Sequence, residues 1–296
     1  NFARYKKIWM SKFTNKKSLA EAISDFRSKG LSADKSQVGF VPTMGALHEG
    51  HLALVKSALS ENHLVVVSIF VNPTQFNNAT DLDKYPRTLD DDLRLLETLD
   101  GHVMIYIPTV DDIYEEEIAA SSYNFGGLEH QMEGKHRNGH FDGVGTVVSK
   151  LFDIVKPNKA YFGEKDFQQL QIIKKLVQLE KLPIEIVGCP IVREKSGLAM
   201  SSRNQRLNKE EQEEASLIYA TLMEVREKFP TQSIEELNEF VSERFLNNSK
   251  IELEYFDIAN EETLETATKK DPSVKHRAFI AAFMGEVRLI DNMPLN

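Results

Sequence analysis

The sequence predicts an α/β fold: a Rossmann-like, doubly wound parallel sheet followed by a smaller C-terminal α+β domain. Short apolar runs alternate with segments of helical periodicity over residues 38–192, as in βαβ units. The run 63–71 is almost continuously β-branched and apolar, which is typical of a strand covered on both faces. After residue 192 the pattern changes to helices and alternating strands. We therefore expect a first domain over residues 1–191 and a lid-like second domain over 192–296.

Composition and charge exclude several classes of protein. The 296 residues suffice for a large core, and the single cysteine, Cys189, excludes an intrachain disulfide framework and fits a reducing compartment such as the cytoplasm. The net charge of −9 argues against a broad nucleic-acid surface, which would need a basic patch. No apolar run approaches the length of a membrane span, and residues 1–9 lack the core of a signal peptide. Met10 could be a natural start, with residues 1–9 as an extension.

The segment VPTMGALHEGH, residues 41–51, links a predicted strand at 38–43 to a predicted helix. It follows a first helix, expected over Lys17–Ser28 with Gly30 as its C-cap. A turn that leads into a helix N-terminus presents unpaired N–H groups and a positive dipole end, both of which favour phosphate. His48 and His51 share one helical face at this spacing. Two solvated histidines are the alternative, while zinc is disfavoured because the HExxH spacing and a clustered third ligand are missing.

The β-branched run 63–71 ends in NPTQF, where Pro73 stops strand pairing and polar side chains gather. Ligands of open α/β sheets bind beyond the carboxyl ends of the strands. If the strands at 38–43 and 63–71 are neighbours, Asn72 and Gln75 therefore face the same crevice as the histidine turn. A polar turn without function is the alternative.

An acidic segment, DLDKYPRTLDDD, looks at first like a metal loop. The structural interpretation is better, because Thr88 with Asp91 resembles a capping box and acids favour the first helical turn. We expect a helix from there to Gly101, and an acidic role near magnesium stays open.

A predicted strand at 102–107 is followed by an irregular acidic stretch at 111–129 and a polar, glycine-rich loop at 133–145. The pair Gly143 and Gly145 does not follow a strand and so is no dinucleotide fingerprint. In this loop Arg137 could bind a carboxylate, since a guanidinium pairs carboxylates with two hydrogen bonds. A solvated loop is the alternative.

A strand at 160–162 runs into Gly163-Glu164-Lys165-Asp166 and a helix at 169–179. Asp166 can cap that helix. Lys165 is unfavourable at a helix N-terminus unless an anion is present, which a bound phosphate would supply. A further strand is expected over 184–192.

The segment 196–206, SGLAMSSRNQR, places two hydroxyls beside an arginine after the last strand of the sheet. Such a loop can hold phosphate oxygens and close over a site, and a cluster of helix N-caps is the alternative. Helices are expected at 209–228 and 233–246, then a strand at 251–258 and a hairpin of 278–283 with 287–290. We expect a hinge near Val192.

Five segments, in this order, resemble the pantoate–β-alanine ligase (pantothenate synthetase) family. They are PTMGALHEGHLALV, SIFVNPTQF, DLDKYPRT, YFGEKDFQQL and IVREKSGLAMSSRNQRL, and the closing RLIDN also fits. The HxGH element alone is shared by the wider HIGH-type nucleotidyltransferase superfamily, whereas the full set is specific to the ligase. A transferase that leaves AMP on its product, or a catalytically silent nucleotide-binding protein, are the remaining alternatives.

The resemblance implies ATP-dependent condensation of (R)-pantoate with β-alanine through a pantoyl-adenylate, with release of AMP and diphosphate. It also implies a requirement for Mg²⁺, a homodimer and a cytoplasmic enzyme, with no nucleic acid or membrane as partner.

The resemblance also assigns roles to residues. His51 would be the catalytic proton donor. Because pantoate and the α-phosphate are both anionic, we also expect His48, His51, Lys165 and magnesium to neutralise their charge. Pantoate would be held by Gln75 and Gln169, with Pro42 and Asn72 beside them, and the carboxylate of β-alanine by Arg137. No metal ligand is assigned. The expected ATP contacts are Met44, Gly45, Ala46, Leu47, His48, Glu49, Gly50, His51, Gly163, Glu164, Lys165, Asp166, Val192, Met200, Ser201, Ser202 and Arg203.

Overall fold

The structure is a computed structural model that describes residues 9–29, 36–76, 79–115 and 117–296. The expected extension up to residue 8 and the expected C-cap at Gly30 lie outside the described residues.

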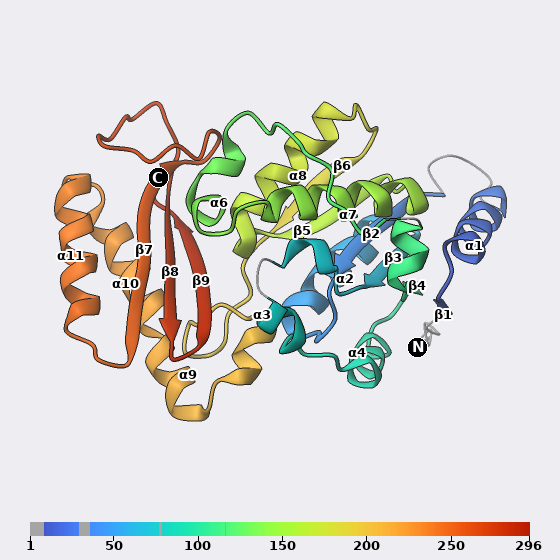
Figure 1. Cartoon of the computed structure of the whole chain (residues 1–296), viewed down its shortest axis with the longest axis horizontal. Coiled ribbons are helices and arrows are strands. Elements are labelled where there is room, and N and C mark those ends of the chain that lie inside the picture. The colour runs from blue at the N-terminus through green and yellow to red at the C-terminus, as the bar shows by residue number, and fades with distance from the viewer. Residues whose placement is uncertain (1–8, 30–35, 77–78, 116) are drawn as a thin grey trace, which may run out of the picture. The chain divides into compact units, whose positions relative to one another are not determined.

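A six-stranded parallel sheet forms the larger part of the fold, which confirms the predicted class (Figure 1). Its spatial order is β1-β4-β3-β2-β5-β6, and every neighbouring pair runs parallel. All six residues of β3 are buried, as expected for a central strand covered on both faces. The strands are β1 (Trp9–Phe13), β2 (Val38–Thr43), β3 (Leu64–Ile69), β4 (His102–Tyr106), β5 (Lys159–Gly163) and β6 (Glu185–Cys189).

Helices cover both faces of this sheet. On one face, Leu52 and Val55 of α2 and Leu96 of α4 share an apolar cluster with sheet residues such as Val41. Neighbouring side chains of a strand point to opposite faces, and Phe40 accordingly meets Phe152 of α7 edge to face, with ring centroids 6.2 Å apart. The helices that follow or precede these strands are α1 (Lys16–Lys29), α2 (Glu49–Glu61), α3 (Ala79–Asp83), α4 (Leu89–Leu96), α5 (Val110–Tyr114), α6 (Met132–His136), α7 (His140–Val155) and α8 (Phe167–Leu179).

The C-terminal residues form an antiparallel sheet of order β7-β8-β9, with helices that share its apolar core. The strands are β7 (Ile251–Asn260), β8 (His276–Met284) and β9 (Val287–Pro294). The single helix expected at 209–228 is two helices, α9 (Lys209–Ala215) and α10 (Leu217–Lys228), which Ser216 separates. The next helix is α11 (Ile234–Leu246), whose N-cap Ser233 forms a capping box with Glu236.

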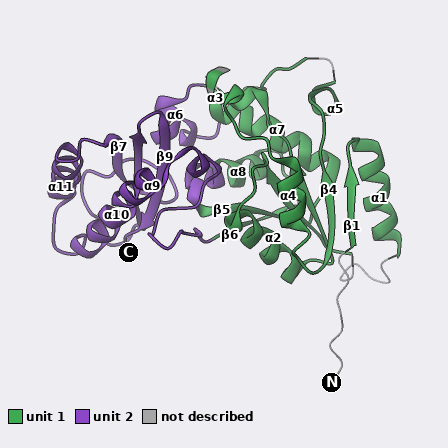
Figure 2. Ribbon diagram, turned by 90° about the horizontal axis from the view of Figure 1, so that it is seen from below, with its two compact units in different colours: residues 1–123, 139–164, 172–189 green, residues 124–138, 165–171, 190–296 purple. Residues whose placement is uncertain are grey.

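The chain packs as two compact units, and it passes between them more than once (Figure 2). Unit 1 contains residues 1–123, 139–164 and 172–189, as far as they are described. Unit 2 contains residues 124–138, 165–171 and 190–296. We expected a single boundary between residues 191 and 192. In the structure, the earlier segments 124–138 and 165–171 also pack with the C-terminal residues.

Two local predictions were wrong, and one strand was not predicted. No strand was expected at Trp9–Phe13, yet these residues form β1 and pair with β4. Thr88 is the N-cap of α4 but makes no capping hydrogen bond, because its hydroxyl donates to Asp92 instead. The loop expected at 133–145 is largely helical: α6 occupies 132–136, and α7 begins at His140.

Gly143 explains why glycine occurs inside α7. A Cβ at this position would lie 2.3 Å from the Thr74 carbonyl oxygen, so the helix can approach the end of β3 only without a side chain there. The glycines of this segment therefore serve packing as well as turns.

Candidate active site

β2 and β5 are neighbours at the point where the strand order reverses, and they pair through Gly39 and Phe40 with Lys159 and Ala160. From β2 the chain order runs outward through β3 to β4 on one side, and from β5 to β6 on the other. Such a switch point is where open α/β sheets bind ligands. The turn 44–48 follows β2, and Gly163 ends β5, so both lie at the carboxyl edge of the sheet.

The two histidines of this turn are held by the first turn of α2. His48 is the N-cap of the helix, and its Nδ1 accepts from the Gly50 N–H at 3.2 Å. His51 Nδ1 accepts from the His48 N–H at 3.2 Å, and the two ring centroids lie 4.1 Å apart. A neutral imidazole whose Nδ1 accepts carries its proton on Nε2. Both rings therefore offer an Nε2–H donor, beside the positive end of a helix dipole.

Asp92 fixes the backbone of the same turn, a role that sequence reasoning missed. Its carboxylate is buried, and its oxygens accept from the Ala46 N–H at 3.0 Å and the Leu47 N–H at 2.7 Å. The hydroxyl of Thr88 adds a third bond at 3.1 Å. The turn needs such an anchor, because Gly45 has φ of 86° and Ala46 has φ of 49°. The only signal in the sequence was the run of three acids that we interpreted as helix-capping.

Asn72 is the N-cap of the 3₁₀ turn η2 (Pro73–Gln75) that follows β3, Gln75 ends this turn, and both residues are buried. The Asn72 amide donates to Gln75 Oε1 and to the Gly143 carbonyl oxygen, each at 3.2 Å. Tyr114 donates its hydroxyl hydrogen to Asn72 Oδ1. The Gln75 amide donates to the Met44 sulfur at 2.7 Å. The network orients the Gln75 amide in unit 1 and connects it with the histidine turn.

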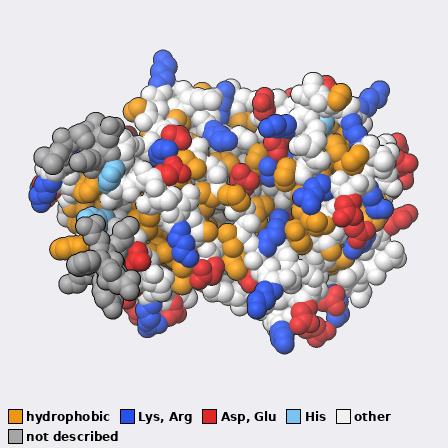
Figure 3. Space-filling model, turned by 180° about the vertical axis from the view of Figure 1, so that it is seen from behind, with side chains coloured by type: hydrophobic (Ala, Val, Ile, Leu, Met, Phe, Trp, Pro, Cys, Tyr) orange, Lys and Arg blue, Asp and Glu red, His pale blue; other side chains and the backbone are white. Residues whose placement is uncertain are grey.

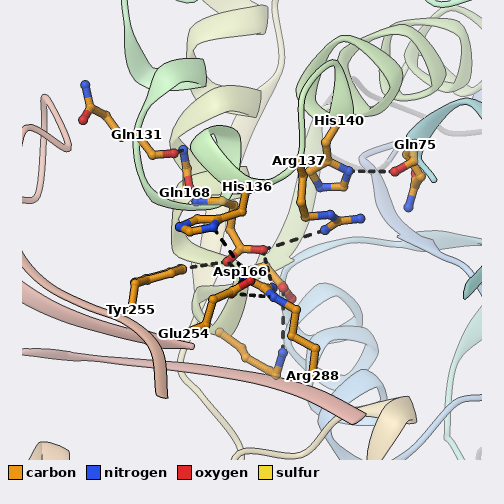
Figure 4. Close-up of polar contacts among 12 residues, drawn as sticks. Gln75, Gln131, His136, Arg137, His140, Asp166, Gln168, Glu254, Tyr255 and Arg288 are labelled. Atoms are coloured by element: carbon orange, nitrogen blue, oxygen red, sulfur yellow. Dashed lines mark hydrogen bonds and ion pairs between the residues drawn. The ribbon is translucent and has the colours of Figure 1, made fainter. Parts of the chain in front are cut away.

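His140 adds a backbone contact to this network. It donates from Nδ1 to the Gln75 carbonyl oxygen at 2.8 Å (Figure 4). Pro42, the remaining expected substrate residue of unit 1, lies half-buried in β2.

Lys165 lies on the 3₁₀ turn η4 (Glu164–Asp166), directly before α8. Its side chain is 18% exposed, and its Nζ lies 3.7 Å from Asp166 Oδ1. The Asp166 carboxylate thus supplies one negative charge to a lysine that the helix dipole disfavours. Gln169 follows in the first turn of α8 and is half-buried.

Gln168, the neighbour of Gln169, was not singled out from the sequence. It is 4% exposed, donates to the carbonyl oxygens of Leu128 and Gln131, and accepts from the Glu133 N–H at 3.0 Å. It therefore attaches the segment 128–133 to α8 within unit 2. The sequence offered no signal beyond the two adjacent glutamines.

Residues 192–200 form a short hairpin rather than an irregular loop. The Met200 N–H donates to the Val192 carbonyl oxygen at 3.0 Å, and the Glu194 N–H donates to the Leu198 carbonyl oxygen at 2.8 Å. Ser201 then caps the 3₁₀ turn η5 (Ser202–Arg206), with its hydroxyl accepting from the Arg203 N–H. Ser201 therefore caps a 3₁₀ turn and not the helix at 209, whose N-cap is Asn208, while Ser202 is buried and Arg203 is partly exposed.

Arg137 follows α6 and lies near a buried carboxylate in unit 2 (Figure 4). Its Nη1 is 3.8 Å from Glu133 Oε2. Glu133 already accepts two hydrogen bonds from Arg288 at 2.8 Å each and one from the Tyr255 hydroxyl at 2.7 Å. Arg137 is thus the more distant cation of this cluster.

The same cluster shifts the pKa values of its members. Burial raises the pKa of Glu133, but the hydrogen bonds and charge of Arg288, together with the Tyr255 hydroxyl, outweigh it and hold the pKa at about 2. Burial raises the pKa of Tyr255, and the Glu133 carboxylate raises it further. Glu133 is accordingly an ion at neutral pH, and Tyr255 is a neutral donor.

The residues expected to bind nucleotide and substrate are divided between the units (Figure 2). Unit 1 holds the turn 44–51, Pro42, Asn72, Gln75, Gly163 and Glu164. Unit 2 holds Arg137, Lys165, Asp166, Gln169, Val192 and residues 200–203.

A preformed magnesium site is not found within the described ranges. No group of three or more His, Cys, Asp or Glu side chains is placed there to hold a metal ion. Asp92 already accepts three hydrogen bonds, and Asp91 pairs with Arg94. Asp91 and Asp92 of the acidic segment are therefore engaged in contacts within the protein.

Two features of the described residues concern nucleic acid and membranes, neither of which was expected as a partner. On the face shown in Figure 3, Lys and Arg side chains are interspersed with Asp and Glu, rather than gathered in a broad basic patch. No helix in the described part of the chain has the length and apolar character needed to cross a membrane.

Comparisons with known proteins agree on one family. A family model described as pantoate-beta-alanine ligase matches residues 11–294. The pantothenate synthetase of Flavobacterium psychrophilum is 56% identical over 267 residues, which cover 90% of this chain and 95% of that protein. That of Christiangramia forsetii is 51% identical, covering 97% of this chain and all of that protein.

Solved structures are similar over almost the whole chain. Pantothenate synthetase from Thermus thermophilus has a TM-score of 0.87 at 39% identity, covering 97% of this chain and 99% of that chain. Pantoate-beta-alanine ligase from Francisella tularensis, described as complexed with beta-gamma ATP and beta-alanine, has a TM-score of 0.77 at 38% identity. That match covers 97% of this chain and 98% of the other.

Proposed function

The chain belongs to the pantoate–β-alanine ligase family, and from this premise we propose how its residues divide the work of an ATP-dependent ligation. The reaction joins pantoate to β-alanine. We propose that it proceeds in two steps through a pantoyl-adenylate, because hydroxide is a poor leaving group from a carboxylic acid whereas AMP leaves readily. The observation that carries the proposal is the pair of Nε2–H donors of His48 and His51 at the α2 N-terminus.

In the first step a carboxylate oxygen of pantoate attacks the α-phosphorus of ATP. The new P–O bond forms as the bond to the bridging oxygen breaks, and diphosphate leaves. Both reactants are anionic, so the step requires hydrogen-bond donors and positive charge held in place. His51, as proton donor, and His48 supply N–H donors from one side of the nucleotide, and Lys165 supplies an ammonium group.

The Gln75 amide is proposed to hold pantoate. Its Nε2 donates to the Met44 sulfur, which is a weak acceptor that a ligand oxygen could replace. Asn72 fixes the other end of the amide through Oε1. Gln169 and Pro42 are proposed as further pantoate contacts on the family resemblance.

In the second step the β-alanine amine attacks the acyl carbonyl, AMP leaves, and the nitrogen loses a proton. Arg137 is proposed to bind the β-alanine carboxylate. Its Glu133 partner is 3.8 Å away and already has two hydrogen bonds from Arg288, so an incoming carboxylate competes with a weak contact.

A pantoyl-adenylate hydrolyses if water reaches it, which gives unit 2 a reason to act as a lid. We propose that the hairpin from Val192 to Met200 delivers Ser201, Ser202 and Arg203 to the phosphates. Gly163, Glu164 and Asp166 are proposed to complete the nucleotide contacts.

Magnesium, the homodimer and a cytoplasmic location stay predictions. With no preformed site in the described ranges, we propose that Mg²⁺ enters with the phosphates of ATP. The requirement for Mg²⁺ is tested by chelation, and the dimer by sedimentation.

The two-step scheme is tested by isotope exchange between diphosphate and ATP. We expect exchange that depends on pantoate and does not need β-alanine, because the first step is then reversible on the enzyme. Exchange that requires β-alanine, or that is missing while pantothenate is made, would overturn the scheme.

Product analysis separates the ligase from its closest alternative. A complete reaction with ATP, pantoate and β-alanine should release AMP in amounts equal to pantothenate. A transferase would instead keep AMP on its product.

A further inference from the structure

Two neighbouring polar residues of β9, Asp291 and Asn292, are almost fully buried. Asp291 is 4% exposed and Asn292 is 2% exposed, although β9 is an edge strand of its sheet. Successive side chains of a strand point to opposite faces. The pair can therefore hold two different segments at once, of which one contains Lys165 and the other leads into residues 200–203.

Asn292 holds the backbone of Lys165. Its Nδ2 donates to the Lys165 carbonyl oxygen at 2.8 Å. Its Oδ1 accepts from Arg277 Nη1 at 2.6 Å, so the orientation of the amide is fixed by a cation. Arg277 in turn pairs with Glu261 at 2.8 Å and lies over the Phe167 ring at 3.9 Å. The amide is thus set rigidly toward η4.

Asp291 holds the hairpin that precedes Ser201. Its two carboxylate oxygens accept from the two terminal nitrogens of Arg193, and one of them also accepts from the Asn292 N–H at 2.8 Å. Arg193 donates to the Gly197 carbonyl oxygen at 3.1 Å and lies over the Tyr219 ring at 4.2 Å. The carboxylate therefore fixes both the entry and the turn of the hairpin.

We propose that Asp291 and Asn292 are positioning residues for adenylation, Asn292 acting through Lys165 and Asp291 acting through the hairpin 192–200. This inference rests on the proposed function, since it assumes that Lys165 and residues 201–203 contact ATP. One rigid strand then sets the separation of an ammonium group and a phosphate-binding turn in unit 2. A displacement of about 1 Å at such a group can lower a rate about 10²-fold.

The test for Asn292 is a double-mutant cycle read by pantoate-dependent diphosphate–ATP exchange. Asn292→Asp keeps the volume and the Arg277 partner but places an acceptor against the Lys165 carbonyl oxygen. We expect the maximal exchange rate to fall about tenfold with the KM for pantoate little changed. In a Lys165→Ala background, Asn292→Asp should change the residual rate less than about twofold, because its effect passes through the lost ammonium group.

The outcomes distinguish this inference from the proposed function. If Lys165→Ala leaves exchange near normal, the assigned role of Lys165 fails. If Lys165→Ala is slow but Asn292→Asp is harmless, or is fully additive with it, only the positioning role fails. If Asn292→Asp does not fold, Asn292→Ser replaces it in the cycle, because a serine side chain is too short to reach Lys165.

Thr221→Val is the matched control for stability. Thr221 is fully buried in unit 2 and donates to the Leu217 carbonyl oxygen at 2.7 Å. Loss of this hydrogen bond in Thr221→Val should lower the melting temperature without changing the exchange rate. An equal fall in exchange for this variant would mean that destabilisation alone accounts for Asn292→Asp.

Asp291→Asn tests the second half of the inference. The single acceptor oxygen cannot pair both terminal nitrogens of Arg193, so the hairpin loses its anchor. We expect the KM for ATP to rise about tenfold, with a smaller effect on the maximal rate. An unchanged KM for ATP in a folded variant would reject the role of Asp291.

Discussion

Individual side chains at the switch point are proposed to carry the chemistry, and their hydrogen bonds set the tautomers of the two histidines. His48 and His51 accept through Nδ1, which leaves the proton of each neutral ring on Nε2. Their type and spacing were evident from the sequence. Their tautomers were not, since these depend on the backbone of the helix N-terminus.

His51→Ala and Lys165→Ala should each lower pantoate-dependent exchange by about 10²-fold or more, because each removes a group proposed to neutralise charge at the α-phosphate. Initial rates at saturating ATP measure the effect. His63→Ala and Lys269→Ala, which alter exposed side chains of the same types, serve as controls. Near-normal exchange in either test variant, with an unchanged circular-dichroism spectrum, removes that residue from the mechanism.

Asp92→Asn should weaken both ATP binding and the fold. Asparagine offers one acceptor oxygen to two backbone N–H groups and turns a donor toward the other, and an unsatisfied buried donor costs about 1–3 kcal/mol. Urea denaturation and the KM for ATP measure the two effects. Asp90→Asn, an exposed change on the same helix, should do neither. If Asp92→Asn changes stability and the KM for ATP no more than Asp90→Asn does, Asp92 does not anchor the turn.

The hydrogen-bond partners of Asp92 and Asn292 could not be predicted from the sequence. Each sat in a recognisable segment, DLDKYPRTLDDD or RLIDN, yet what each holds is set by contacts across the fold. Asp92 reaches 45 residues back to Leu47, and Asn292 reaches 127 residues back to Lys165. No local pattern encodes such a pairing.

Among the helices and strands, those with a strong period were predicted well. The strand at 38–43 is β2, and the β-branched run became the fully buried β3. The short β1 was missed because its residues are half-exposed and polar in part, so little apolar pattern marks it. The start of α7 was missed because glycine was taken as a loop signal, while Gly143 serves a close helix contact.

Gly143→Ala should disturb the substrate network through this contact. The added methyl would overlap the Thr74 carbonyl oxygen, and overpacking of this kind costs about 1–3 kcal/mol. Since the Gly143 carbonyl oxygen also accepts from Asn72, we expect the KM for pantoate to rise. Steady-state kinetics and thermal melting check both effects.

Asp153→Ala, on the exposed side of α7, is the matched control. It keeps the helix but lies away from η2. A wild-type KM for pantoate in Gly143→Ala would show that α7 does not set the position of Asn72.

At the scale of the whole molecule, acid stability should depend on Glu133. Its pKa of about 2 lies below the ordinary value of 4.5, so the unfolded chain takes up a proton that the native protein does not. The contribution is present in full above pH 4.5 and is lost as pH falls toward 2, with a slope of up to about 1.4 kcal/mol per pH unit.

Glu133→Gln should therefore be less stable at neutral pH, and its free energy of unfolding should fall less steeply between pH 4.5 and 2. Chemical denaturation across this range measures the slope, with Glu210→Gln at an exposed position as the control. Parallel curves for the wild type and Glu133→Gln would contradict the assignment of that proton.

The family and the α/β class were evident from motif order and periodicity. The division of the chain was harder to predict, because segments 124–138 and 165–171 pack with residues far along the sequence. Their apolar and ionic partners, such as Phe279 for Phe167, become visible only in three dimensions.

That route of the backbone limits how a gene for this enzyme can be cut. A fragment encoding residues 190–296 would lack Glu133 and Phe167. Arg288 would then lose the Glu133 carboxylate to which it donates two hydrogen bonds. Arg277 would lose the Phe167 ring over which it lies. The C-terminal unit is therefore no transplantable module, and recombination between relatives should succeed only where all three of its pieces come from the same parent.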